Sequence, residues 1–259
     1  MIIEKTSTIK NTHTTKNADA LTSMLDLCRQ VIPYLNGKFE APQQQQILKN
    51  NNEWLTGQAQ DYQTIQALKA DLQKQNPDAG SAYYQARLWH LLCWQPIYIT
   101  FISVYGLKQL PDFTGFKQQR QHNAIIGFVF QSNNVSTGEI DQLITQAAKQ
   151  LKPLIEHYRI QLNSLQRCPS GYAGRFIADS IMSNLLRVRE FDADFNDQTI
   201  LNHAKRWLNA FALPEKLVNS LQTNTEKPIK LIRTSCCLAD RINEKLCADC
   251  PKANKLRFK

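Results

Sequence analysis

Four of the seven cysteines lie in one short segment of the chain. Cys236 and Cys237 are adjacent, and Cys247 and Cys250 follow after a gap of nine residues, with two residues between them. A C-x-x-C turn can bring two thiolates onto one metal, and four thiolates are a complete ligand set for Zn²⁺ or for an iron–sulfur cluster. The pattern therefore predicts a metal centre with these four cysteines as ligands.

Three kinds of site are compatible with this spacing. Structural zinc sites usually pair two C-x₂₋₄-C turns, and the side chains of adjacent cysteines diverge, so Cys236 and Cys237 rarely close one tetrahedron. A two-iron cluster accepts that divergence more readily, because its two irons have separate coordination positions. A thiol–disulfide site at Cys247 and Cys250 would leave the other two cysteines unused. The spacing favours the cluster, then zinc, then thiol exchange.

The surroundings of these cysteines are basic. Between Lys227 and Lys259 there are nine Lys and Arg residues and three acidic ones. Nearby positive charge favours the reduced state of an iron–sulfur cluster, because reduction makes the cluster more negative. Arg233 and Arg241 flank the adjacent cysteines, and we expect them to tune the cluster or to contact a ligand, with a simply solvated tail as the alternative.

The segment also resembles a known motif. Arg233-x-x-Cys-Cys-Leu-x-x-Arg241 followed by Cys-x-x-Cys-Pro251 is similar to the C-terminal motif of FhuF-type ferric-siderophore reductases. That family has the pattern C-C-x10-C-x2-C, so the gap here is one residue shorter. The resemblance covers about the last 30 residues of the chain.

The resemblance implies a [2Fe–2S] cluster and one-electron reduction of an imported Fe(III)-siderophore, chiefly a hydroxamate, with release of Fe(II). It implies no catalytic side chain beyond the cluster. No Gly-rich phosphate loop is found in the sequence, so the electrons are expected from an external donor such as a ferredoxin or a reductase. The alternative function is a Cys₄ zinc protein that binds nucleic acid through its basic tail, but a nucleic-acid partner is the less favoured hypothesis.

Composition sets the broader class. The chain has 259 residues, a hydrophobic fraction of 42% and a formal net charge of +9. These values exclude wholesale disorder and a small disulfide scaffold, and the positive charge suggests an anionic partner. No secretory signal is visible in the sequence, so we expect a cytoplasmic protein, with a peripheral position at the inner membrane left open.

Apolar periodicity predicts an α+β fold that is predominantly helical, with a few strands and a C-terminal cysteine-rich segment. We expect a flexible N-terminus at 1–17, a mainly helical body with the substrate cleft at 18–227 and the cluster segment at 228–259. The most apolar stretch, 88–107, contains polar residues and Pro96. It is expected to form a buried element broken at Pro96, without a membrane span.

Other local patterns complete the expected elements. Residues 124–130 predict a buried strand, and Ser136 to Glu139 resembles a capping box that opens a long helix. A glutamine tract at 43–46 is expected to be a solvated helix start.

The remaining cysteines and histidines carry no metal-site spacing. Cys28 and Cys93 lie in apolar runs and are expected in the core, whereas Cys168 lies in a turn and is expected to be open to solvent. His90 is expected to be a core or cleft residue.

Overall fold

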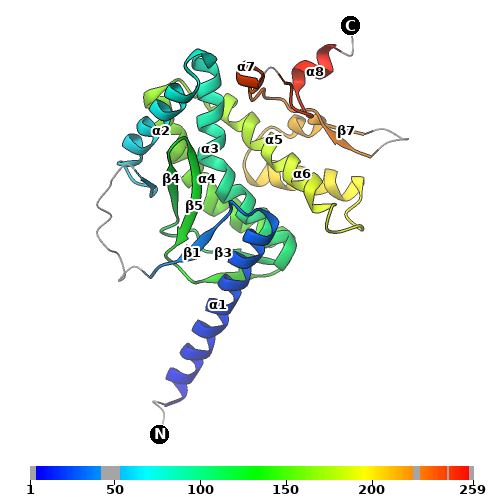
Figure 1. The fold of residues 1–259 in the computed structure, drawn as a ribbon. Helices are drawn as coiled ribbons and strands as arrows, with labels where there is room; N and C mark the ends of the chain where they lie inside the picture. Colours follow the sequence, from blue (N-terminus) through cyan, green and yellow to red (C-terminus); the bar gives the residue numbers. More distant parts are fainter. Residues whose placement is uncertain (1–3, 42–52, 224–227, 244, 257–259) are drawn as a thin grey trace.

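The computed structural model describes residues 4–41, 53–223, 228–243 and 245–256. The glutamine tract at 43–46 lies outside these residues. The predicted class is confirmed: the fold is α+β and predominantly helical, with the cysteine-rich segment at its C-terminal end (Figure 1). The helices are α1 (Glu4–Val31), α2 (Asp61–Gln75), α3 (Ser81–Phe101), α4 (Ile140–Leu165), α5 (Ser170–Val188), α6 (Asp197–Ala210), α7 (Asp240–Asn243) and α8 (Pro251–Leu256), with 3₁₀ turns η2 (Pro77–Ala79) and η4 (Glu215–Ser220).

The first helix is longer than its apolar pattern predicts. Periodicity suggested a start at Ala18, but α1 begins at Glu4, within the segment expected to be a flexible terminus. No Gly or Pro interrupts this segment, so the helix can continue beyond its apolar face. The helix ends at Val31 because Pro33 disfavours helical geometry in the residue before it. In Figure 1 its N-terminal end projects from the body.

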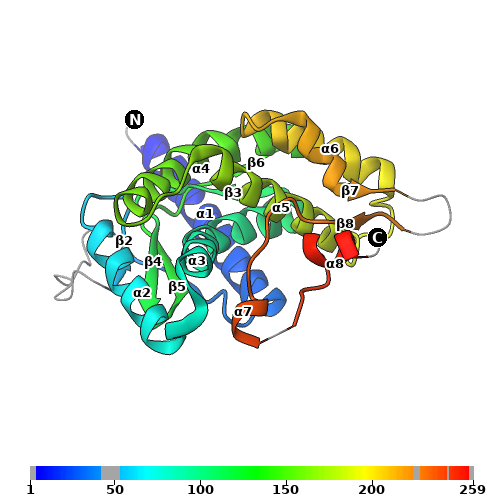
Figure 2. The same ribbon diagram turned by 90° about the horizontal axis from the view of Figure 1, so that it is seen from above.

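Helix α3 runs through the centre of the molecule, between α2, α4 and α5 (Figures 1 and 2). The expected break at Pro96 is wrong: the helix is continuous and passes into a π-helical turn, η3 (Ile102–Gly106). Proline removes one intrahelical donor and would leave the carbonyl of Leu92 without its partner. Gln118 Nε2 donates to that carbonyl at 2.9 Å, so a residue distant in sequence replaces the missing bond.

Short strands cover one side of the helical body. The four-stranded sheet has the order β1 (Gly37–Phe39), β5 (Ala124–Phe130), β4 (Lys117–Gln121), β2 (Trp54–Leu55). The pair β1–β5 is parallel, and the other two pairs are antiparallel. Strand β5 confirms the prediction at 124–130. Two smaller ribbons pair β3 (Gln109–Pro111) with β6 (Val135–Thr137), and β7 (Leu221–Gln222) with β8 (Lys230–Leu231).

The long helix expected after the capping box is present as α4, but the capping box is not. Ser136 and Thr137 belong to β6, and the helix begins after Glu139 without a side-chain cap. Pairing with β3 therefore overrides the local capping signal. Cysteines 28, 93 and 168 are all buried. Among the described residues, no helix is long and apolar enough to cross a membrane.

Candidate metal centre

The cysteine segment follows β8 and lies across one end of the helical body, beside α3 and α5 (Figures 1 and 2). The backbone N–H of Arg233 donates to the carbonyl of Asp249 at 3.0 Å, which closes the segment into a loop. Helix α8 begins at Pro251, directly after Cys250, and proline suits the first turn of a helix. The loop therefore holds the first and second cysteine pairs in one compact unit.

Asp179 of α5 anchors this loop to the body. Its carboxylate is 1% exposed and accepts bonds from the backbone N–H groups of Thr234 and Ser235, both at 2.8 Å. The Thr234 hydroxyl donates to the same carboxylate at 3.0 Å. Burial raises the pKa of Asp179, and the bonds from Thr234, the nearby Arg233 guanidinium and the bond from Ser235 oppose that shift. An acidic residue inside an apolar helical run is the only signal for this role in the sequence, and that signal alone does not predict which loop the carboxylate holds.

The structure brings the thiols of the two pairs together. Cys237 Sγ lies 3.8 Å from Cys247 Sγ, so the contact joins the first pair to the second. The backbone N–H of Cys250 donates to the Cys247 carbonyl at 3.1 Å, as expected of a C-x-x-C turn. Cys250 is buried, whereas Cys236, Cys237 and Cys247 are partly exposed.

The thiols of the loop influence one another's pKa values. Burial, then the neighbouring Cys237 and Cys250, raise the pKa of Cys247 to about 12. Burial also raises the pKa of Cys236, while the Leu238 N–H and the Lys252 ammonium lower it. Thiolates as near one another as Cys237 and Cys247 repel unless a metal neutralises them, so metal binding would release their protons.

The donor set fits an iron–sulfur cluster. A [2Fe–2S] cluster takes four thiolates, two on each iron, and here the sulfurs come as two pairs that meet at Cys237 and Cys247. In the described part of the chain, no three or more Cys, His, Asp or Glu side chains are grouped closely enough to hold one metal ion. The residues that would hold the cluster are Cys236, Cys237, Cys247 and Cys250.

The two flanking arginines have different positions. Arg233 Nε lies 3.9 Å from the Asp179 carboxylate, and its guanidinium stands 5.7 Å from the centre of the Phe176 ring. Its charge also lowers the pKa of Cys247. Arg241 instead donates to the carbonyl of Ala79 at 3.2 Å, a residue 162 positions earlier in the chain. Arg233 is thus beside the thiols, while Arg241 ties α7 to the body.

Lys252 is a third cation at the site, and our sequence analysis gave it no role. Its ammonium lies 2.6 Å from the Asp240 carboxylate, which raises the pKa of Lys252 and lowers that of Asp240. The same ammonium lowers the pKa of Cys236. The charge of Lys252 on α8 therefore acts on Cys236.

A cavity of about 440 Å³ adjoins the cysteine loop. Its wall includes Cys237 and Arg233 from the loop, and Arg87 and His90 from α3. His90 opens into this recess, as the cleft alternative predicted. His90 is exposed to solvent within the recess, but the protein atoms around it, then the charges of Arg87 and Arg233, lower its pKa to about 4, so its imidazole is neutral at neutral pH.

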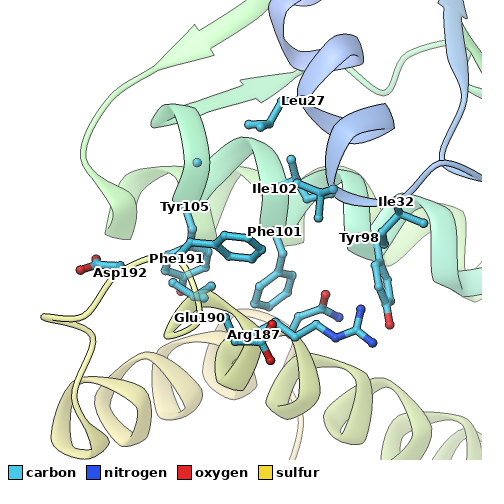
Figure 3. Close-up of a pocket in the computed structure, with 14 residues that line it drawn as sticks. Leu27, Ile32, Tyr98, Phe101, Ile102, Tyr105, Arg187, Glu190, Phe191 and Asp192 are labelled. Atoms are coloured by element: carbon cyan, nitrogen blue, oxygen red, sulfur yellow. The ribbon is translucent and has the colours of Figure 1, made fainter.

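A larger cavity of about 540 Å³ lies between α1, α3 and the C-terminal end of α5 (Figure 3). Tyr98 and Phe101 line it, and the Arg187 guanidinium stands 5.0 Å from the centre of the Tyr98 ring. None of the described residues that line it is a cysteine. The smaller cavity is therefore the one that adjoins the cysteine loop, because Cys237 itself lines it.

The other three cysteines are structural. The core positions predicted for Cys28 and Cys93 are confirmed, and burial raises the pKa of both thiols. The prediction that Cys168 is open to solvent was wrong: its side chain is fully buried, and burial raises its pKa to about 11. Its backbone N–H donates to Asn163 Oδ1 at 2.8 Å, which holds the turn against α4.

The cysteine loop matches a known family. Residues 233–252 match the family described as the FhuF 2Fe-2S C-terminal domain, and the cysteines at 236, 237, 247 and 250 fit its cluster motif. The cofactor of this segment is therefore a [2Fe–2S] cluster. No solved structure matches the chain.

Proposed function

We propose that this protein is a ferric-siderophore reductase of the oxidoreductase class. The observation that carries the proposal is the match of residues 233–252 to the FhuF 2Fe-2S C-terminal domain. The substrate is an Fe(III)-siderophore, with hydroxamates favoured by the resemblance. One electron from an external donor, such as a ferredoxin or a reductase, converts Fe(III) to Fe(II), and the donor is oxidised by one electron.

A bound [2Fe–2S] cluster supplies a one-electron redox centre, which we assign to Cys236, Cys237, Cys247 and Cys250. The chain itself positions this centre and its substrate. Asp179 holds the loop on α5, and Arg233 and Lys252 place positive charge beside the thiolates.

The reaction needs no general acid, base or nucleophile from the protein. Hydroxamate and carboxylate oxygens are hard ligands that suit Fe(III) better than Fe(II), so addition of one electron is enough to loosen the chelate. What the protein must supply is a binding site close to the electron source. The cavity beside Cys237 supports this proposal, because a ligand in it is in contact with the wall of the cysteine loop.

The first experiment identifies the metal. The protein is purified anaerobically and analysed for iron, acid-labile sulfide and zinc. We expect two irons and two sulfides per chain with visible charge-transfer absorption, as a [2Fe–2S] cluster requires. A colourless protein with one zinc would refute the proposal.

The second experiment tests the reaction. The chemically reduced protein is mixed with a ferric hydroxamate in a stopped-flow instrument, with a ferrous chelator present. We expect reoxidation of the protein with formation of the ferrous complex, and no reduction of the protein by NADH or NADPH alone. A protein that stays reduced with every hydroxamate and catecholate chelate would rule out the reductase function.

A further inference from the structure

The cavity beside Cys237 has an uneven charge. Two guanidinium groups, Arg87 and Arg233, stand in its wall, and none of the described residues that line it carries a carboxylate. Neutral polar groups complete the polar part of the lining, among them His90 and Asn76. A recessed cavity with cations and without carboxylates attracts anionic ligands, because low-dielectric walls strengthen the interaction.

The two guanidinium groups differ in their contacts with other residues of the protein. Arg233 is close to the Asp179 carboxylate and the Phe176 ring, and its charge acts on Cys247. Arg87 has no hydrogen bond or ion pair to any residue in the described part of the chain. Arg233 therefore has a role in supporting the cysteine loop, whereas the charge of Arg87 has no opposite charge paired with it among the residues that the structure describes.

His90 adds no charge to the cavity. Because its imidazole is uncharged at neutral pH, the positive charge of the cavity belongs to the arginines alone. The guanidinium fork gives a carboxylate two parallel charge-assisted hydrogen bonds, whereas a neutral imidazole has a single N–H donor and no charge.

We infer that this cavity selects ferric siderophores that carry a free carboxylate, and that Arg87 is the residue that binds this carboxylate. The inference rests on the proposed function. Three hydroxamates neutralise the charge of Fe(III), so the iron centre of such a chelate carries no net charge. Discrimination by charge must then depend on groups at the periphery of the siderophore. Arg87, in the wall of the cavity, can bind such a group.

The test uses two gallium complexes that differ in one peripheral group. Desferrioxamine B ends in an ammonium group, and its succinylated derivative ends in a carboxylate. Ga(III) has the charge of Fe(III) but is not reduced here, so binding is measured without electron transfer. Titration calorimetry with the cluster-loaded protein should show about tenfold tighter binding of the carboxylate form, as expected for a charge-assisted hydrogen-bonded pair.

Variants of the protein assign the effect to Arg87. Arg87→Gln should abolish the preference, and Arg87→Lys should retain part of it, since a lysine keeps the charge without the fork. Arg29→Gln is the matched control: Arg29 lies on α1, pairs with Asp26 and should leave the preference unchanged. The visible spectrum of the cluster is recorded for each variant and should match that of the wild type.

Equal binding of the two gallium complexes by the wild type would overturn the inference, as would a preference that persists in Arg87→Gln. These outcomes are distinct from failure of the proposed function. A reductase without charge selection would reduce both ferric complexes equally and bind both gallium complexes equally. A protein that binds with the predicted selectivity but reduces neither ferric complex would contradict the reductase proposal and leave the carboxylate site of Arg87 intact.

Discussion

Among the individual residues, the four clustered cysteines differ from the other three in what surrounds them. Cys28 and Cys93 are enclosed by apolar side chains, which favour a neutral thiol. In the loop, the Arg233 guanidinium lowers the pKa of Cys247 and the Lys252 ammonium lowers that of Cys236, although burial raises both by more. The thiolate is the form that binds metal, so these two charges partly oppose the effect of burial on Cys247 and Cys236 and favour ligation there.

We expect Ser substitutions at Cys236, Cys237, Cys247 and Cys250 each to abolish or severely disturb the cluster, because a [2Fe–2S] cluster needs all four thiolates. Visible absorption and electron paramagnetic resonance of the reduced protein measure the effect. Cys28→Ser is the control and should keep the native spectrum. Native spectra in any two of the four loop variants would contradict the ligand assignment.

The Lys252 ammonium should raise the reduction potential. Reduction adds negative charge near this cation, so Lys252→Gln should lower the midpoint potential by some tens of millivolts, roughly the Coulomb energy of one partly solvated charge. Redox titration at fixed pH measures the change. Lys38→Gln, which removes a lysine paired with Glu40 on β1, should leave the potential unchanged. A potential that is unchanged or raised in Lys252→Gln would show that this charge does not act on the cluster.

Among the secondary-structure elements, α5 and α3 connect the cysteine loop to the body. Helix α5 presents the buried carboxylate of Asp179 to two backbone N–H groups of the loop. Helix α3 contributes Arg87 and His90 to the cavity wall. The carbonyl of Ala79, in the η2 turn just before α3, accepts a hydrogen bond from Arg241. Both helices also pack in the core, so the position of the loop depends on the same packing that stabilises the fold.

Asp179→Ala should detach the cysteine loop from helix α5. Removal of the carboxylate leaves two backbone donors unpaired and the Arg233 charge uncompensated, which costs about 2–4 kcal/mol. We expect faster loss of the cluster to a strong iron chelator and faster proteolysis between 232 and 250. Asp179→Asn keeps one acceptor oxygen and should show a smaller effect. Equal rates in Asp179→Ala and the wild type would mean that the carboxylate does not hold the loop.

A second prediction for the secondary-structure elements concerns Pro96 in α3 and its neighbour Gln118. Gln118 is buried and donates to the Leu92 carbonyl and to the Tyr158 hydroxyl, at 2.9 and 3.1 Å. Gln118→Leu leaves both acceptors without this donor and should lower the free energy of unfolding by about 2–4 kcal/mol. Pro96→Ala restores an N–H that can bond Leu92, so the loss should be smaller in the double variant.

Chemical denaturation of the four proteins in this cycle measures the coupling between positions 96 and 118. Additive effects would show that Gln118 does not act by satisfying the carbonyl that Pro96 leaves free.

At the scale of the whole molecule, the net charge of +9 favours encounter with acidic partners. Reduction of the protein by an acidic ferredoxin-type donor should therefore slow as salt is added, because the Debye length falls to about 8 Å at physiological ionic strength. Stopped-flow rates across a range of salt concentrations test this expectation. Dithionite is unsuitable as a control because it is itself anionic, so a neutral photoreductant serves instead. A rate independent of salt for the acidic donor would exclude electrostatic steering.

The sequence by itself determined the metal centre and the class of the fold. The four cysteines lie within one short loop, so their spacing already contains the proposed ligand set, and these cysteines fit the motif of the family matched at residues 233–252. Strand β5 was also predicted, because it is a short run of β-branched and aromatic residues, and so was the long helix α4, because its apolar residues recur at helical spacing.

Only the tertiary structure decided what surrounds that centre. Asp179 reaches Thr234 across 55 positions of the chain, and Arg241 reaches Ala79 across 162. Continuity of α3 at Pro96 depends on Gln118 from a neighbouring strand, and burial of Cys168 depends on the packing of its turn. Spacing along the chain reports only contacts that the covalent backbone enforces nearby. Contacts between distant residues form when helices and strands pack, and no local pattern encodes them.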